Sequence, residues 1–197
     1  MKKRNVIQAP LGEKEVLLHT CCAPCSSAII EAMMQNGITP VIYYCNPNIY
    51  PLEEYEIRKN ECTRYAQSLG LEIVDDDYDH DNWLKAVRGL EGEPERGGRC
   101  LKCFKLRLLR TAEYARARGI KVITTTLASS RWKSLDQINE AGLWACSQIA
   151  TSEHEVTWWD HNWKKGGLQE RRLQIIKEYE FYNQLYCGCE FSMRKDK

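Results

Sequence analysis

Cysteine is the residue type on which the chemistry of this sequence depends. The chain of 197 residues contains ten cysteines and has a formal net charge of +1. Thiols stay reduced in the cytosol, so clustered cysteines in a protein of that compartment indicate metal binding or redox chemistry rather than structural disulfides. A chain of this length also buries a core large enough to fold without disulfides.

The first cluster consists of Cys21, Cys22 and Cys25. Pro24 is typical of the first turn of a helix, so the sequence predicts that these thiols lie at a helix N-terminus. There the helix dipole and the free N–H groups favour the thiolate, which is the form that binds metal. His19, close to the cluster, is either a hydrogen-bonding neighbour of a ligand or a buried core histidine.

The second cluster is the Cys-x-x-Cys pair of Cys100 and Cys103, which follows a glycine-rich segment predicted to be a loop. Zinc sites, iron–sulfur clusters and thioredoxin-like redox pairs all use this spacing. Together with Cys21 and Cys22, the pair offers enough thiolates for zinc or for a 4Fe–4S cluster. Two adjacent cysteines fit separate irons of a cluster better than two positions on one zinc ion. Cys25 is then left as a spare thiolate, which raises the question of a further iron.

The third group is the pair of Cys187 and Cys189, with Gly188 as the single residue between them. Glycine gives the backbone the freedom to bring two sulfurs close together. A disulfide between such residues is strained, and strain makes it easier to reduce. The sequence therefore predicts a reversible redox pair, with further metal ligands and, last, a free structural pair as the alternatives. Three other cysteines occur singly and are predicted to be structural: Cys45, Cys62 and Cys146.

Two segments carry side chains suited to binding nucleic acid. Lys164 and Lys165 follow three tryptophans within residues 158–163, and such a mixture can stack on unpaired bases while holding phosphates. A tryptophan group packed in the core is the alternative. Asn46 and Asn48 lie in a turn-rich segment after a predicted strand, where their amides could read a base edge or form an ordinary turn.

Alternating strands and helices are predicted to position these residues. Apolar, β-rich runs predict strands over residues 16–19, 40–45, 71–74 and 121–126. Helices are predicted over residues 24–36, 52–69, 81–88, 103–118, 137–147 and 168–185. The alternation indicates an α/β fold with a parallel sheet, in which sites gather at the carboxyl ends of the strands.

We expect one domain over residues 1–197, with a short N-terminal extension over 1–14 and a C-terminal tail over 186–197 that carries the Cys-Gly-Cys pair. No run reaches the ~18 apolar residues of a membrane-spanning helix. The basic start of the chain lacks the long apolar segment of a signal peptide. These features predict a soluble, cytoplasmic protein with no membrane partner.

Five ordered blocks of the sequence resemble the QueH-type epoxyqueuosine reductases: residues 17–26, 46–49, 98–103, 124–127 and 186–192. The resemblance extends from about residue 16 to residue 193. It implies a Rossmann-like parallel sheet with flanking helices, related to the PP-loop (adenine nucleotide alpha hydrolase-like) fold. One departure is Arg131-Trp132-Lys133, which stands where we expect a Pro-His-Lys-like sequence.

The resemblance also implies cofactors and site residues. It implies a 4Fe–4S cluster and no dependence on cobalamin. The family's cluster cysteines map onto four residues of this sequence: Cys21, Cys22, Cys100 and Cys103. Its redox-active pair, which closes to a disulfide, maps onto Cys187 and Cys189.

The implied reaction removes the epoxide oxygen of epoxyqueuosine in the anticodon loop of tRNA and gives queuosine, the last step of queuosine biosynthesis. It consumes two electrons and two protons. Side chains do not supply low-potential electrons, so a cofactor and an electron donor that the sequence does not identify are needed. His19 and the acidic run over residues 75–81 are candidates for the proton donor.

Two other functions share parts of the pattern. A PP-loop-type tRNA sulfur transferase would have a glycine-rich phosphate-binding loop after the first strand, whereas this chain has Thr20, Cys21 and Cys22 there. A structural zinc module that binds RNA without chemistry would use the same thiolates but would be colourless. The visible spectrum of anaerobically purified protein separates zinc from iron–sulfur.

Overall fold

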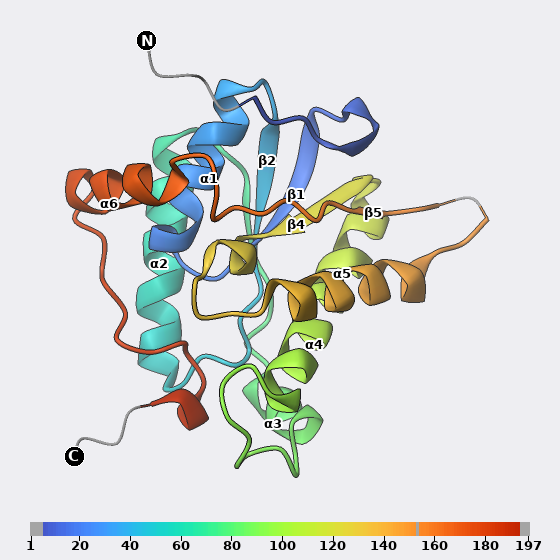
Figure 1. Ribbon diagram of the computed structural model, residues 1–197, viewed down its shortest axis with the longest axis vertical. Helices are drawn as coiled ribbons and strands as arrows, with labels where there is room; N and C mark the ends of the chain where they lie inside the picture. The colour runs from blue at the N-terminus through green and yellow to red at the C-terminus, as the bar shows by residue number, and fades with distance from the viewer. Residues whose placement is uncertain (1–5, 153, 194–197) are drawn as a thin grey trace.

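The computed structural model describes residues 6–152 and 154–193 and contains a five-stranded parallel sheet (Figure 1). Its strands are β1 (Glu15–Thr20), β2 (Thr39–Tyr44), β3 (Ile73–Asp75), β4 (Val122–Thr125) and β5 (Thr157–Trp158). The order across the sheet is β3-β2-β1-β4-β5. The predicted parallel α/β fold is confirmed. The first part of the predicted extension (1–5) and the end of the predicted tail (194–197) lie outside the described residues.

Helices cover both faces of the sheet (Figure 1). They are α1 (Ala23–Gln35), α2 (Leu52–Ser68), α3 (His80–Ala86), α4 (Gly98–Arg118), α5 (Leu135–Ile149) and α6 (Leu168–Glu178). Short 3-10 turns are η1 (Pro10–Gly12), η2 (Thr126–Ser129) and η3 (Glu190–Ser192). Because β-helix-β crossovers are right-handed, α1 and α2 lie on one face of the sheet and α4 and α5 lie on the other. Helix α6 packs on α1.

The central strand β1 is buried on both sides. Val16, Leu17 and Leu18 have no exposed surface, as expected for a parallel strand between two helical layers. β1 pairs with β2 on one side and with β4 on the other. The chain moves outward from β1 in both directions, so β1 and β4 flank the topological switch point, where such sheets bind ligands.

Helix α4 begins earlier than the sequence predicted. The glycines predict a loop up to Arg99, but the helix starts at Gly98 and includes Cys100. The Glu93 carboxylate accepts the N–H of Gly98, and Arg99 donates to the carbonyl of Glu91 at 2.7 Å. These contacts stabilise the first turn of the helix despite the low helix propensity of glycine.

The last helix ends sooner than predicted, and one strand was not predicted. Helix α6 stops at Glu178 because the following chain binds α2: Arg64 donates to the carbonyl of Tyr179 at 3.0 Å, and the Tyr182 N–H donates to Glu61 at 2.9 Å. The segment then runs past α2 toward α3 (Figure 1). Strand β5 has two residues, too few for a sequence pattern. No helix among residues 6–152 and 154–193 is long and apolar enough to cross a membrane.

Candidate metal and redox site

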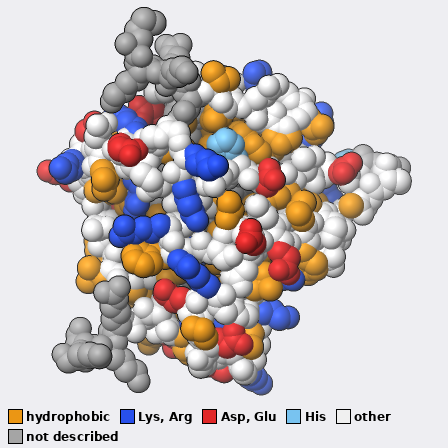
Figure 2. Space-filling view, in the orientation of Figure 1, with side chains coloured by type: hydrophobic (Ala, Val, Ile, Leu, Met, Phe, Trp, Pro, Cys, Tyr) orange, Lys and Arg blue, Asp and Glu red, His pale blue; other side chains and the backbone are white. Residues whose placement is uncertain are grey.

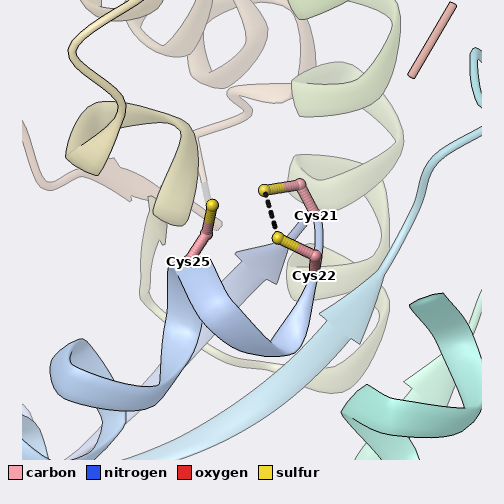
Figure 3. Close-up of side chains that lie close together, drawn as sticks. All are labelled: Cys21, Cys22 and Cys25. Carbon is pink, nitrogen blue, oxygen red and sulfur yellow. Dashed lines mark hydrogen bonds between the residues drawn. The ribbon is translucent and has the colours of Figure 1, made fainter. Parts of the chain in front are cut away.

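Three cysteine side chains converge at the carboxyl end of β1. Cys21 follows the strand, Cys22 is the N-cap residue of α1, and Cys25 lies in the first turn of that helix (Figure 3). The three Sγ atoms lie within 4.8 Å of one another, and those of Cys21 and Cys22 are 3.8 Å apart. The group therefore occupies the crevice at the switch point of the sheet.

The end of the neighbouring strand fixes the position of Cys21. Thr126, the first residue of η2 after β4, accepts the N–H of Cys21 with its Oγ1 at 3.2 Å. The same hydroxyl donates to Cys21 Sγ at 3.4 Å. Pro24 lies at the start of α1 as predicted, so the sulfurs stand at the positive end of the helix dipole.

The electrostatics of these thiols fit a bound cation. Hydrogen bonds from Cys22 and Cys25 lower the pKa of Cys21 well below its usual value, and the charge of Lys133 acts in the same direction. A hydrogen bond to Cys21 raises the pKa of Cys22. A hydrogen bond to Cys21 also raises the pKa of Cys25, to about 12. Three adjacent thiolates repel one another unless a cation compensates their charge, so this donor set suits a thiophilic metal.

Cys100 and Cys103, the other predicted ligands, lie in the first two turns of α4. Cys100 Sγ accepts the N–H of Arg96 at 3.3 Å, and Cys103 Sγ accepts a hydrogen bond from Arg107 at 3.9 Å. Burial lowers the pKa of the Arg107 guanidinium, but the negative charges of Cys103 and Cys21 outweigh this effect, so the pKa is raised overall. Arg107 is thus in contact with Cys103 and is also influenced by the charge of Cys21, although the compact group among the described residues contains neither α4 cysteine.

The Cys-Gly-Cys pair places one sulfur in solvent and one in the core. All ten cysteines lie within the described residues and all are free thiols. Cys187 is exposed, whereas Cys189 is buried with Trp83 and Cys103. Of the predicted redox pair, only Cys187 is therefore directly accessible to a partner.

A cavity of about 790 Å³ brings the two cysteine groups to one space. Its lining includes Cys25 from the converging group and Cys187 from the tail, together with the cationic side chains of Lys133 and Lys164. A smaller hollow with part of the same lining is bounded by Cys100 and again by Cys187. Cys187 therefore lies between the cavity and the start of α4.

Buried Arg58 of α2 holds the backbone of the Cys-Gly-Cys pair. It donates to the carbonyls of Tyr186 at 3.3 Å and Cys187 at 3.2 Å, and its charge is paired with Glu54 at 2.6 Å. Gly188 has a φ of +136°, and a Cβ there would meet side-chain atoms at 3.1 to 3.3 Å. The glycine is thus required both by its backbone conformation and by close packing.

We expect Arg58→Met to destabilise the protein by about 3 to 5 kcal/mol, because it leaves Glu54 buried without its ionic partner. The double variant Glu54→Gln/Arg58→Met should recover part of this loss. Urea unfolding measures both, and Arg88→Met, which changes an exposed side chain, is the control. Equal losses in the single and double variants would show that the buried charge is not the cause.

His19 is a buried core histidine, one of the two predicted alternatives. Its Nε2 lies 3.0 Å from the carbonyl oxygen of Cys45, which can only accept, so Nε2 carries the proton. Nδ1 then accepts the Thr125 hydroxyl at 2.7 Å. Burial, aided by the charge of Arg107, lowers the pKa of His19 to about 3. With both ring nitrogens bound to protein atoms, His19 is a poor proton donor for a substrate.

The two predicted base-reading amides are also buried. Asn46 and Asn48 are 1% and 3% exposed. Asn46 Nδ2 donates to the carbonyl of Thr20 at 2.9 Å, and its Oδ1 accepts from Arg107. This amide connects the ends of β1 and β2 to α4, an arrangement that favours a structural role.

The predicted aromatic and basic segment divides into a core part and a surface part. Trp158, Trp159 and Trp163 are buried, so the core alternative holds for the tryptophans. Lys164 lines the cavity and donates to the carbonyl of Lys133 at 3.3 Å. Lys165 is exposed but does not line the cavity.

The acidic run after β3 is used within the fold. Asp76 forms an ion pair with Arg110 of α4 at 2.7 Å, and Asp75 accepts the Tyr55 hydroxyl at 2.7 Å. Asp79 caps α3. The Asp76 contact also pairs one of the cationic side chains of α4, Arg110, within the fold.

Comparison with known proteins identifies the family. The family described as "Epoxyqueuosine reductase QueH" matches residues 16–195. The chain belongs to this family. A protein named Epoxyqueuosine reductase QueH from Histophilus somni (strain 129Pt) is 46% identical over 191 residues, which cover 97% of this chain and 77% of that protein.

More distant relatives extend the family similarity. The protein of that name from Acinetobacter baylyi is 44% identical over 193 residues, covering 98% of this chain and 87% of the relative. The one from Thermotoga maritima is 33% identical over 187 residues, covering 92% and 93%. The QueH family match includes all ten cysteines of the chain and the residues that line the cavity.

Sequence reasoning did not assign roles to two cations that the structure places beside the sulfurs. Arg107 is buried between hydrogen bonds to Cys103 and to Asn46. Lys133 is half-buried, and although burial opposes its charge, Cys187 and Cys21 raise its pKa. Lys133 retains the lysine of the Pro-His-Lys-like sequence expected there, and this match was the available signal, whereas an arginine on a basic helix carries no distinctive one.

Proposed function

We propose that this protein is an epoxyqueuosine reductase that acts in the cytoplasm on tRNA carrying epoxyqueuosine in its anticodon loop. The observation that carries the proposal is the shared cavity, which Cys25 of the converging group and Cys187 of the Cys-Gly-Cys pair both line. A candidate metal site and one cysteine of the candidate redox pair, Cys187, therefore face one space, large enough to admit a modified base. Membership of the QueH family supports the same activity.

The proposed cluster ligands are Cys21, Cys22, Cys100 and Cys103. Cys21 and Cys22 belong to the converging group, and the charges of both Cys103 and Cys21 act on the buried Arg107. Cys25 remains as an additional sulfur that could serve a further iron. When bound, a 4Fe–4S cluster supplies low-potential electrons one at a time, and no cobalamin is required.

Cys187 and Cys189 are proposed to supply the two-electron step. Removing the epoxide oxygen takes two electrons and two protons, and a dithiol that closes to a disulfide releases both. One epoxide and two thiols are consumed, and one alkene, one water and one disulfide are formed. An external electron donor then reduces the disulfide through the exposed Cys187.

Lys133 is proposed to stabilise charge during this step. Its side chain belongs to the cavity wall together with Cys187. As the C–O bond of the epoxide breaks, negative charge develops on the oxygen, and a nearby fixed ammonium group lowers the energy of that state. No carboxylate of residues 75–81 lines the cavity, so this role does not involve the acidic run.

The two alternative functions have less support. The turn between β1 and α1, where a sulfur transferase would hold pyrophosphate, contains Cys21 and Cys22 and no glycine. A zinc module without chemistry leaves the free Cys-Gly-Cys pair beside the cavity without a role.

The test is conversion of the substrate. Anaerobically purified protein is incubated with tRNA that contains epoxyqueuosine and with a chemical reductant, and the digested nucleosides are analysed by mass spectrometry. We expect loss of one oxygen atom to give queuosine. Iron-loaded protein that binds the tRNA but leaves the epoxide intact would contradict the proposal.

A further inference from the structure

The indole of Trp132 is a large exposed aromatic surface at the cavity. Trp132 lies between η2 and α5 and is 59% exposed. It lines both the main cavity and the smaller hollow that is bounded by Cys100 and Cys187. An exposed indole at the wall of a cavity offers a face on which a planar ligand can stack.

The loop that carries this indole is held in place from both sides. Arg96 donates to the carbonyls of Trp132 at 2.8 Å and of Arg131 at 3.0 Å, and the N–H of Trp132 donates to the Ser130 hydroxyl at 3.2 Å. The Arg131 guanidinium lies 4.7 Å from the centre of the indole ring. Because the backbone is already ordered, little conformational entropy is lost when a ligand stacks there.

Cationic side chains surround the same opening. Lys164 and Arg172 line the cavity with Lys133 and Arg131, whereas Glu95 is the one acidic residue in its described lining. Figure 2 shows Lys and Arg side chains gathered near the middle of the face that carries α6. Arg172 is oriented by its bond to the carbonyl of Pro24 at 2.8 Å.

We propose that Trp132 stacks on an unpaired base of an RNA strand while Lys164 and Arg172 hold phosphates of that strand. An aromatic platform among cations is how proteins bind single-stranded nucleic acid, and the charge of the opening complements a phosphate backbone. The inference rests on the proposed function for the identity of the strand, the anticodon loop. It places the stacked base beside Cys187, and it assigns to Trp132 the role that the buried tryptophans cannot fill.

The test measures binding without catalysis. Anaerobically purified protein is titrated with a labelled anticodon stem-loop RNA that lacks epoxyqueuosine, and fluorescence anisotropy gives Kd. Trp132→Ala should weaken binding about 5- to 100-fold, as expected for loss of one stacked base, and Trp132→Phe should keep most of the affinity. Trp144→Ala, which changes a half-exposed tryptophan of α5 that does not line the cavity, is the matched control.

The phosphate contacts are tested by salt dependence. Lys164→Gln and Arg172→Gln should each reduce the slope of log Kd against log salt by about 0.7. Lys121→Gln, at the opposite end of the sheet beside the start of β4, removes the same charge and should leave the slope unchanged. Circular dichroism verifies that the Trp132 variants fold. Trp132→Leu serves as a second variant that removes the indole ring but keeps an apolar side chain.

The outcomes separate this inference from the proposed function. Native affinity in a folded Trp132→Ala variant overturns the inference, even if the native protein reduces epoxyqueuosine. Loss of RNA binding in Trp132→Ala, with a native protein that binds the RNA but never converts the epoxide, supports the inference and overturns the proposed function. If Lys121→Gln lowers the slope of log Kd against log salt as much as Lys164→Gln does, the assignment of the phosphate contacts is wrong.

Discussion

Cys21→Ala and Cys22→Ala are expected to retain less than about a tenth of the native iron after anaerobic purification, because a cluster that loses one thiolate ligand is weakly held. Both sulfurs belong to the group that converges within 4.8 Å at the end of β1. Iron and acid-labile sulfide assays measure the loss, and the visible absorbance of the cluster should fall in parallel.

The matched control for this prediction is Cys146→Ala. Cys146 is a buried free thiol on α5, outside the converging group, so its removal creates a small cavity without touching the site. Full iron occupancy in Cys21→Ala and Cys22→Ala would contradict the metal assignment. Equal iron loss in Cys146→Ala would instead indicate that the variants lose iron because they are less stable.

The same assay decides between two sets of ligands. The family resemblance assigns Cys100 and Cys103 to the cluster, whereas the geometry groups Cys25 with Cys21 and Cys22. We expect Cys100→Ala and Cys103→Ala to lose iron as completely as Cys21→Ala, and Cys25→Ala to keep the cluster absorbance. If Cys25→Ala loses the cluster while Cys100→Ala and Cys103→Ala keep it, the result favours Cys25, together with Cys21 and Cys22, as the ligands.

The sequence predicted where Cys21 and Cys22 lie in the fold because their placement depends on local patterns. A β-rich run, then cysteines, then proline indicates a strand followed by a helix start, and the structure places Cys22 at the N-cap of α1. The parallel sheet follows from the alternation of strands and helices. Right-handed crossovers then bring the ends of β1 and β4 together, and this arrangement explains the contact between Cys21 and Thr126.

The features that the sequence did not predict depend on tertiary contacts. The helical pattern after Leu168 runs on to residue 185, but contacts with Arg64 and Glu61 on α2 override it after Glu178. Burial separates tryptophans that look alike in sequence: Trp163 is completely buried, whereas Trp132 is exposed. Nothing local to either residue encodes that difference.

Cys187→Ser and Cys189→Ser are expected to keep native iron and the native visible spectrum but to fall below about 1% of the native multiple-turnover rate, because a single thiol cannot close a disulfide or deliver two electrons. The structure supports unequal roles for the two sulfurs. Cys187 is exposed at the cavity and can meet substrate or donor, whereas Cys189 is buried against Trp83 and Cys103. Queuosine formed per enzyme measures turnover, and Cys146→Ser is the control.

Thiol labelling tests the same pair without substrate. In the reduced protein Cys187 should react before Cys189, because only Cys187 is exposed. After mild oxidation both should be protected together, since Gly188 allows the backbone to bring the two sulfurs into bonding distance. Iron loss in either serine variant would make the pair part of a metal site. Native turnover in both would mean that the pair is structural and that electrons reach the substrate by another route.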